Sequence, residues 1–282
     1  MSSNVRARRL TAALLLILAT ASSSDELPSE LRASFEEGVR ALKAEKLAEA
    51  EAAFERVLQH PGGRVAYVHN NLGIVYERHG QRHKAVEQFR EAIRLDPAYV
   101  APRILLGASL LALGRTREAT LVLEETVELA PREPLARQQL AKAYERADDP
   151  AAAVDQYRAL RELAPREPEW AYQLGRAYLR LSEWSLGELK RVDPRSARLH
   201  QARGHTYRVQ GRTELALRAF ERAAQADPAL PEIHLALAQI YLEQRRFSDA
   251  RREIDLELRI VPESAGARAL ERQLRAAESK SP

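Results

Sequence analysis

Histidine is the side chain in this sequence with the widest choice of chemistry, because an imidazole can ligate a metal or transfer a proton near neutral pH. Three of the seven histidines recur at one position of a repeated segment: His69, His200 and His234. A recurring position favours packing over chemistry. His79 and His83 lie four residues apart, but Gly80 between them marks a turn, and no H-E-x-x-H sequence occurs. The histidines therefore predict neither a metal site nor a catalytic site.

Carboxylate pairs, phosphate loops and thiols do not supply an active site either. Glu124 and Glu125 are adjacent in sequence, so on a helix their side chains point in different directions. Gly62-Gly63 is not followed by the Lys and the Ser or Thr of a phosphate-binding loop. The chain has no cysteine, which excludes disulfides, cysteine-bound zinc and thiol catalysis. We predict that the protein is not an enzyme and uses no cofactor.

The composition predicts which elements must position any binding residues. Charged residues make up 30% of the chain and aromatic residues 6%, while Ala, Leu, Arg and Glu are abundant. These four are good helix formers, and strand formers are scarce. An all-α fold is therefore expected.

The N-terminal residues resemble a secretory signal peptide. Three arginines precede an apolar run from Leu10 to Ala19, and a small-x-small cleavage pattern ends at Ala21. We expect a cleaved signal over residues 1–21, a linker over 22–30, and a periplasmic or secreted product without stable membrane insertion. An uncleaved signal that anchors the protein in a membrane is the alternative.

The formal net charge of +4 does not indicate a nucleic-acid partner. Three of these positive charges belong to the predicted signal, at Arg6, Arg8 and Arg9, so the mature chain would carry a formal +1. A near-neutral chain lacks the basic excess that nucleic-acid binding requires. We predict that no nucleic acid is bound.

A spacing of 34 residues recurs along the chain. Prolines follow it, with one shorter interval of 29 residues: Pro97, Pro131, Pro165, Pro194, Pro228 and Pro262. A series of small residues keeps step with them: Gly38, Gly73, Gly107, Ala141, Gly175, Gly204 and Ala238. A fixed period of this length is typical of helical repeat proteins.

Each period predicts two helices. Gly73 and Tyr76 fall on one face of a first helix, where the missing side chain lets a second helix approach. Gly80 marks the end of that helix. Ala85 and Phe89 then share one face of the second helix, which a proline ends.

The stretch from Ala66 to Tyr99, with NNLGIVYERHG followed by AVEQFREAIRLDP, resembles the tetratricopeptide repeat. The resemblance implies an all-α, right-handed solenoid of antiparallel helix pairs that ends in a capping helix. In the same phase, a capping helix and tail over 265–282 follow seven repeats, which span 31–65, 66–99, 100–133, 134–167, 168–196, 197–230 and 231–264.

Two places depart from the family pattern. In the fifth repeat the second helix is shortened, and around Ser182 we expect a brief second segment with a local kink or change of twist. We expect Trp184 nearby to fill core. Glu257 stands where the family prefers a small residue, and we expect it to face the C-terminal helix, near Arg268 or Arg272.

The resemblance implies that the first helix of each repeat lines a concave groove that holds a protein or peptide. Carried over to this chain, the groove positions are apolar in the early repeats and basic in the later ones. The candidates are Tyr67, Asn70, Lys142, Arg146, Tyr172, Arg176, Arg180, His205 and Arg208. For the basic part we hypothesise an acidic segment or a C-terminal carboxylate as guest. Ordinary solvated helix charges are the alternative.

Two functions stay open on the sequence. The first is an exported scaffold or adaptor that binds a protein or peptide in the groove. The second is a stable subunit or assembly factor of an envelope complex, held by its convex face or its ends. Neither the partner nor the oligomeric state can be read from the chain.

Overall fold

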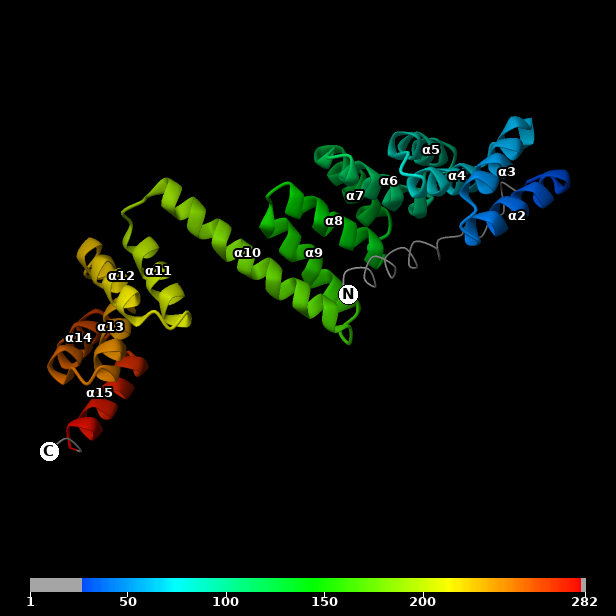
Figure 1. The fold of residues 1–282 in the computed structure, drawn as a ribbon. Coiled ribbons are helices and arrows are strands. Elements are labelled where there is room, and N and C mark those ends of the chain that lie inside the picture. Colours follow the sequence, from blue (N-terminus) through cyan, green and yellow to red (C-terminus); the bar gives the residue numbers. More distant parts are fainter. Residues whose placement is uncertain (1–26, 280–282) are drawn as a thin grey trace. The chain divides into compact units, whose positions relative to one another are not determined.

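The computed structural model describes residues 27–279, and every regular element in this part of the chain is helical (Figure 1). The all-α prediction is confirmed. The α-helices are α2 (Ser29–Lys43), α3 (Leu47–Gln59), α4 (Ala66–Arg78), α5 (Arg82–Leu95), α6 (Val100–Ala112), α7 (Thr116–Leu129), α8 (Pro134–Arg146), α9 (Pro150–Leu163), α10 (Pro168–Val192), α11 (Ala197–Val209), α12 (Thr213–Ala226), α13 (Ile233–Glu243), α14 (Phe247–Ile260) and α15 (Ala265–Glu278). The predicted signal peptide lies outside the described residues. None of the described helices combines the length and the apolar character needed to cross a membrane.

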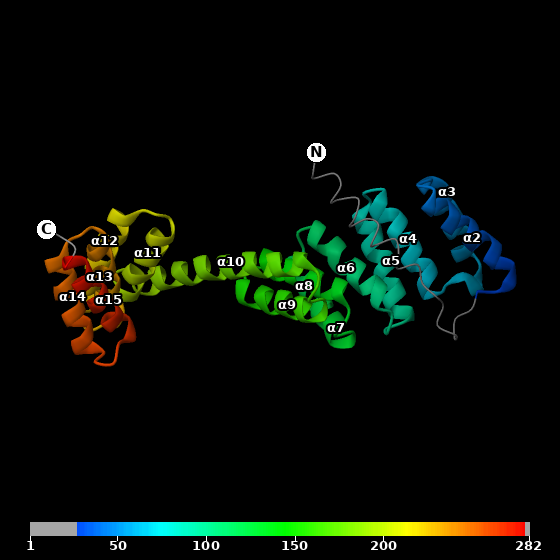
Figure 2. The ribbon, with the colours of Figure 1, turned by 90° about the horizontal axis from the view of Figure 1, so that it is seen from below.

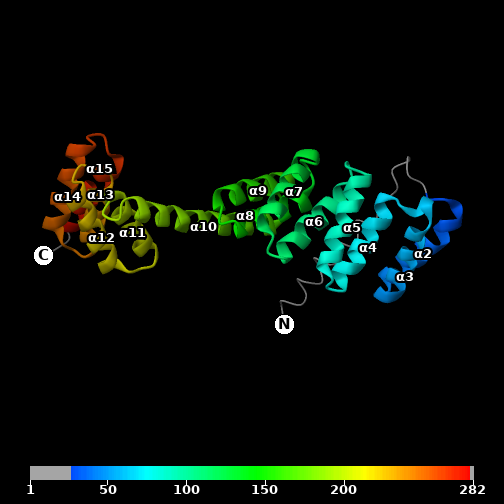
Figure 3. The same cartoon turned by 90° about the horizontal axis from the view of Figure 1, so that it is seen from above.

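The chain divides into two compact units between Leu181 and Ser182, within helix α10. Figure 2 shows α2 to α9 of the first unit as successive helix pairs. Figure 3 shows α11 to α15 of the second unit packed together. Each unit has its own apolar core, around Phe54 and Phe89 in the first and around Phe220 in the second.

The helices pair because a small residue on the first admits a bulky side chain from the second. A Cβ atom on Gly73 would lie 2.5 Å from the ring of Phe89, and one on Gly204 would lie 2.6 Å from Phe220. Both rings are fully buried. At Gly38, Gly73, Gly107 and Gly204 the predicted series of small residues therefore marks points of close helix contact, where a dense interior leaves no room for a side chain.

A residue in the left-handed conformation, here called the turn residue, follows the first helix of all described pairs except the fifth. Glycines fill this place with φ between 71° and 76° at Gly80, Gly114 and Gly211. Residues with a Cβ fill it with φ between 58° and 60° at Glu45, Asp148 and Arg245. The cost is about 1–2 kcal/mol for each residue with a Cβ. Only the repeat period could have located Glu45 and Arg245, because their residue types do not indicate a turn, whereas aspartate is a common turn residue.

The fifth repeat differs from the prediction because its two helices are joined. Helix α10 runs for 25 residues without interruption. Ser182 stands 34 residues after the turn residue Asp148, yet it stays helical. Neither glycine nor proline stands at this position, and the first proline that follows is Pro194. The expected break is therefore wrong, and so is the expected burial of Trp184, which is 43% exposed.

Helix α15 closes the apolar face of the last pair. Ala267, Leu270 and Leu274 are buried in the core of the second unit. The predicted C-terminal capping helix is confirmed, and its role is the usual one of a terminal helix in a repeat array.

Candidate functional site

A hollow of about 390 Å³ opens in the first unit between α6, α8 and α10, the first helices of three consecutive repeats. Its apolar wall consists of Ala108, Leu111 and Ala112. Its polar wall consists of Gln139, Lys142, Glu145, Arg146 and Arg180. Three predicted groove residues therefore meet here, namely the lysine and the two arginines. Gln139 is an addition, because it lies outside the groove positions carried over from the family.

Lys142 is the cation of this hollow that lacks a firm partner. Its side chain is half-buried beside the apolar wall. Burial lowers the pKa of the Lys142 ammonium, and the Glu145 carboxylate offsets only part of that effect. Among residues 27–279 no carboxylate forms a close ion pair with it. Burial removes part of the hydration of this ammonium group. An anion bound in the hollow would compensate that loss by a favourable charge interaction.

The two arginines are anchored to the ends of neighbouring helices. The Arg146 guanidinium donates to the carbonyl oxygen of Leu111 in the last turn of α6. The Arg180 guanidinium donates to the carbonyl oxygen of Glu145 in α8 at 3.4 Å. Carbonyl groups at a helix C-terminus lack intrahelical donors and carry partial negative charge. These arginines therefore stabilise the stacking of first helices, and part of their donor capacity is already used.

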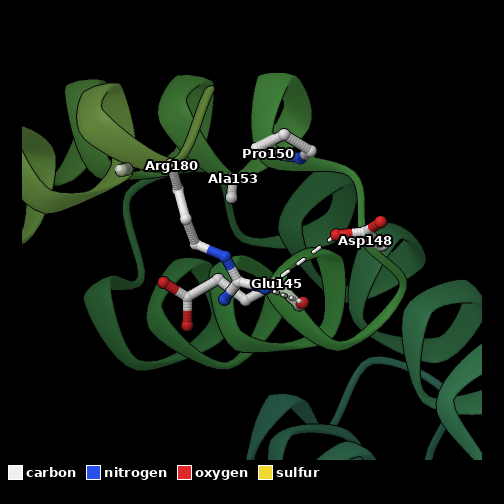
Figure 4. A pocket seen from close by; sticks show the side chains of 6 residues that line it. Glu145, Asp148, Pro150, Ala153 and Arg180 are labelled. Carbon is white, nitrogen blue, oxygen red and sulfur yellow. Dashed lines mark hydrogen bonds and ion pairs between the residues drawn. The ribbon is translucent and has the colours of Figure 1, made fainter. Parts of the chain in front are cut away.

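Figure 4 shows Arg180 extending toward Glu145 and Asp148 at a small pocket beside the hollow. The Arg180 guanidinium lies 3.9 Å from the Asp148 carboxylate. Pro150 and Ala153 of α9 form the apolar side of the pocket. Its volume of about 10 Å³ is close to what one water molecule needs. The pocket can hold solvent but not a side chain.

The candidates Tyr67 and Asn70 do not line an open groove. Asn70 is 0% exposed, and neither polar atom of its amide has a partner among the described residues. The Tyr67 ring packs edge-on against Phe35 at 5.1 Å. Its hydroxyl accepts a hydrogen bond of 3.3 Å from the backbone N–H of Leu27. Side chains and the start of the described chain therefore close the inner side at this end.

Tyr172 and Arg176 lie on exposed surface of α10 and are not part of the hollow's wall. The Arg176 guanidinium stands over the Tyr172 ring at 5.9 Å and donates to the Gln173 side chain at 3.3 Å. These contacts are local to one helix. They leave the outward face of α10 uncovered.

His205 and Arg208 belong to the second unit. The Arg208 guanidinium makes two hydrogen bonds to the Glu243 carboxylate, at 2.6 and 2.8 Å. This bidentate contact lowers the pKa of Glu243 and occupies the arginine. His205 packs edge-on against Phe220 at 5.1 Å. Arg208 is therefore already engaged within the second unit.

Two of the three histidines that recur at one repeat position are buried between helices. His69 and His234 are buried, and each contacts the residue 19 positions further on, at 2.8 Å to Gln88 and 2.7 Å to Glu253. The predicted packing role is confirmed for both. Within residues 27–279 no group of three or more metal-binding side chains occurs.

Comparison with known protein families agrees with the repeat pattern. Three family models, each described as a tetratricopeptide repeat, match residues 66–99, 139–188 and 209–274. Together these matches span more than half of the chain. The second includes the uninterrupted part of α10, so the fifth repeat keeps the sequence pattern of the family although its turn is absent.

Individual relatives are distant. The chain is 21% identical over 198 residues to the anaphase-promoting complex subunit CDC16 of Saccharomyces cerevisiae, covering 69% of this chain but only 21% of the yeast protein. A tetratricopeptide repeat protein from Parabacteroides merdae is 14% identical with a TM-score of 0.51, covering 88% of this chain and 100% of that one. The crystal structure of the APC/C hetero-tetramer Cut9-Hcn1 is 17% identical with a TM-score of 0.43, covering 95% of this chain and 45% of that one. The Parabacteroides structure supports the fold.

Proposed function

Because this chain is a tetratricopeptide-repeat protein, we propose that it is a non-enzymatic scaffold that holds a protein or peptide in the hollow between α6, α8 and α10. The observation that carries this proposal is Lys142, a half-buried ammonium group without a close carboxylate partner in the described chain. Such a group is costly to keep unless a ligand compensates it.

The chemistry of the hollow favours an acidic guest. Lys142, Arg146 and Arg180 line it together with one carboxylate, Glu145. The arginines keep part of their donor capacity, because a guanidinium has five N–H groups and each is anchored to one carbonyl oxygen. An acidic side chain or a C-terminal carboxylate would accept from Lys142, while Ala108 and Leu111 would contact its aliphatic portion.

A peptide-binding measurement tests this. Fluorescent hexapeptide libraries with a free C-terminal carboxylate, with an internal Asp or Glu, or with neither are titrated with the full chain. We expect binding of the acidic libraries, and loss of about tenfold or more in affinity for Lys142→Met, because one charge-assisted hydrogen bond is removed. Lys43→Met removes an exposed lysine of the first unit and is the matched control. Equal binding by the neutral library, or by Lys142→Met, would exclude the proposed acidic guest.

Export is a second part of the proposal. It rests on the arginines and the apolar run before Ala21, which lie outside the described residues. Mass spectrometry of the protein purified from its native cells should find the N-terminus near Ser22 and the protein in the envelope fraction. An intact N-terminus in the membrane fraction would favour an uncleaved anchor, and a cytosolic protein would exclude export.

A stable subunit of a larger complex is the second candidate. Helix α7 is the second helix of the third repeat, and its Leu121 is 54% exposed. Leu121 lies beside a depression of about 500 Å³, which Glu124 and Tyr144 also line. The yeast relative is, by its name, a complex subunit. Leu121→Arg should then abolish co-purification of a partner in fixed stoichiometry, whereas Lys142→Met should not. The reverse result would favour the peptide scaffold.

A further inference from the structure

Helix α10 has an uncovered face where other first helices receive a second helix. A Cβ atom on Gly175 would meet nothing within 4 Å, in contrast to the crowded Gly73 and Gly204. On the same side Tyr172 is 60% exposed and Leu179 is 69% exposed. The contact with α9 uses a different face of α10, that of Leu174, Ala177 and Leu181. The continuous helix thus leaves apolar surface that a second helix could bury.

The residues on this face have the spacing of a coiled coil. Successive members are separated alternately by three and four residues, and we call them the α10 stripe: Tyr172, Gly175, Leu179, Ser182, Leu186 and Leu189. This spacing keeps one narrow stripe of a helix facing a partner helix along its length. The stripe carries no charged residue, so its burial leaves no charge unpaired.

Charges beside the stripe favour one particular partner. Along one edge, at intervals of seven residues, the charges alternate in sign: Glu169, Arg176, Glu183 and Lys190. If a second copy of α10 pairs antiparallel, Glu169 lies near the second copy's Lys190, and Arg176 lies near the second copy's Glu183. Edge charges of this kind set partner and orientation in coiled coils. In a parallel pair these charges would face the opposite edge, where Ala171, Tyr178 and Ser185 supply no partner charge.

The same register also matches residue size. Antiparallel pairing that satisfies the charges places Leu186 opposite Gly175, Leu179 opposite Ser182, and Tyr172 opposite Leu189. A large side chain thus faces a small one in the four central layers of six, because each of these two pairs occurs twice, and the two backbones can approach there. Because each contact occurs twice about a twofold axis, the face is complementary to itself.

We infer that two copies of this chain associate through an antiparallel pair of α10 helices. The second copy supplies the helix that the fifth repeat lacks. This interface lies on another face of α10 than Arg180 and the hollow, so it does not depend on the proposed peptide binding.

Cysteine trapping tests the orientation, since the chain has no cysteine of its own. Full-length Tyr172→Cys and Leu189→Cys chains are oxidised separately and as a mixture. The antiparallel register predicts a disulfide dimer in the mixture only. In each separate sample the two introduced thiols would be roughly 25 Å apart, for 17 residues at a rise of 1.5 Å. Disulfide formation within each separate sample would indicate a parallel pair, and its absence from every sample would overturn the proposal.

Sedimentation equilibrium of the full chain tests the contact itself. We expect a monomer–dimer equilibrium that Gly175→Leu weakens at least tenfold, because the added side chain occupies the space for Leu186 of the second copy. Gly187→Leu makes the same change on another face of α10, where a Cβ atom also meets nothing within 4 Å, and should leave the dimer unchanged. A purely monomeric wild-type chain, or a Gly175→Leu chain that dimerises normally, would overturn the proposal.

A charge swap provides an independent check. Arg176→Glu should weaken the dimer, since it places like charges opposite each other twice. Adding Glu183→Arg in the same chain should restore it, because the pairs are then reversed. Failure of the double variant to recover would contradict the proposed register.

Discussion

The buried carboxylate of Glu257 on α14 accepts a hydrogen bond of 3.2 Å from the backbone N–H of Glu232, the residue before α13. Glu232 has a φ of 71° and makes no side-chain cap of its own. Glu257 is 1% exposed. Through this hydrogen bond its side chain, on one helix, caps the start of a neighbouring helix. The arginine partner expected for it is engaged elsewhere, since Arg268 donates to Pro262 and Glu263. A long side chain at this position compensates an irregular helix start.

Glycine should stabilise the protein at left-handed positions. Glu232→Gly and Arg245→Gly are each expected to raise the free energy of unfolding by about 1 kcal/mol, because glycine avoids the strain of a Cβ atom at positive φ. Urea unfolding followed by circular dichroism measures this. Gln244→Gly, next to Arg245 but at a φ of −82°, should lower stability and is the matched control. A lower free energy of unfolding in both Glu232→Gly and Arg245→Gly would contradict the left-handed conformation of these two residues.

Small residues on the first helices should tolerate a methyl group only where the second helix is absent. Gly73→Ala should cost about 1–3 kcal/mol, since its Cβ atom would lie 2.5 Å from Phe89. Gly187→Ala in α10 meets no atom within 4 Å and should gain about 0.5–1 kcal/mol from helix propensity. Thermal and urea unfolding of both variants provide the comparison. Similar effects of the two substitutions would mean that α10 is covered at Gly187.

Two tyrosine hydroxyls should differ in their contribution to stability. The Tyr99 hydroxyl is buried without a partner in the described chain, and burial raises its pKa. The Tyr144 hydroxyl donates to the Glu124 carboxylate at 2.7 Å. Tyr99→Phe should leave stability unchanged or raise it, whereas Tyr144→Phe should cost about 1 kcal/mol. Equal losses in urea unfolding would show that a bound water satisfies Tyr99.

Because of Lys142, the free energy of unfolding should increase as the pH becomes alkaline. Burial lowers its pKa in the folded state below the ordinary value of 10.5, so folding disfavours the charged ammonium. Between the two pKa values the unfolded chain binds more protons, and the free energy of unfolding therefore increases with pH. Lys142→Met should be more stable than wild type at pH 7 and should lack this part of the rise. Unfolding curves between pH 7 and 10.5, with Lys43→Met as control, would show no difference if Lys142 were fully solvated.

The helix pairs could be predicted because their signals are local and repeat. Gly73 and Phe89 lie 16 residues apart, and the same pair of small and bulky residues recurs at Gly204 and Phe220. Such contacts form within one hairpin of helices, so their spacing in sequence maps directly onto spacing in space. The turn residues Glu45 and Arg245 could not be recognised by residue type, because neither glutamate nor arginine favours the left-handed conformation.

Lys142, Arg146 and Arg180, which helical phase assigned to the first helices of consecutive repeats, line one hollow in the structure. Helical phase gives the position of a side chain and says nothing of its partners. It could not tell which of these cations is already engaged. That depends on backbone carbonyls such as those of Leu111 and Glu145, which come from a preceding repeat and have no signature of their own.

The repeat period and the spacing of small and large residues are determined by the amino-acid sequence, because each small-large pair lies within one hairpin of helices. Packing between helices determined three further features of the structure. It closed the inner face at Asn70, left Lys142 without a close partner, and continued α10 through Ser182. Ser182 remains helical although Glu45 and Arg245, which are also neither glycine nor proline, turn at the same repeat position, so residue type at the turn does not by itself decide the outcome.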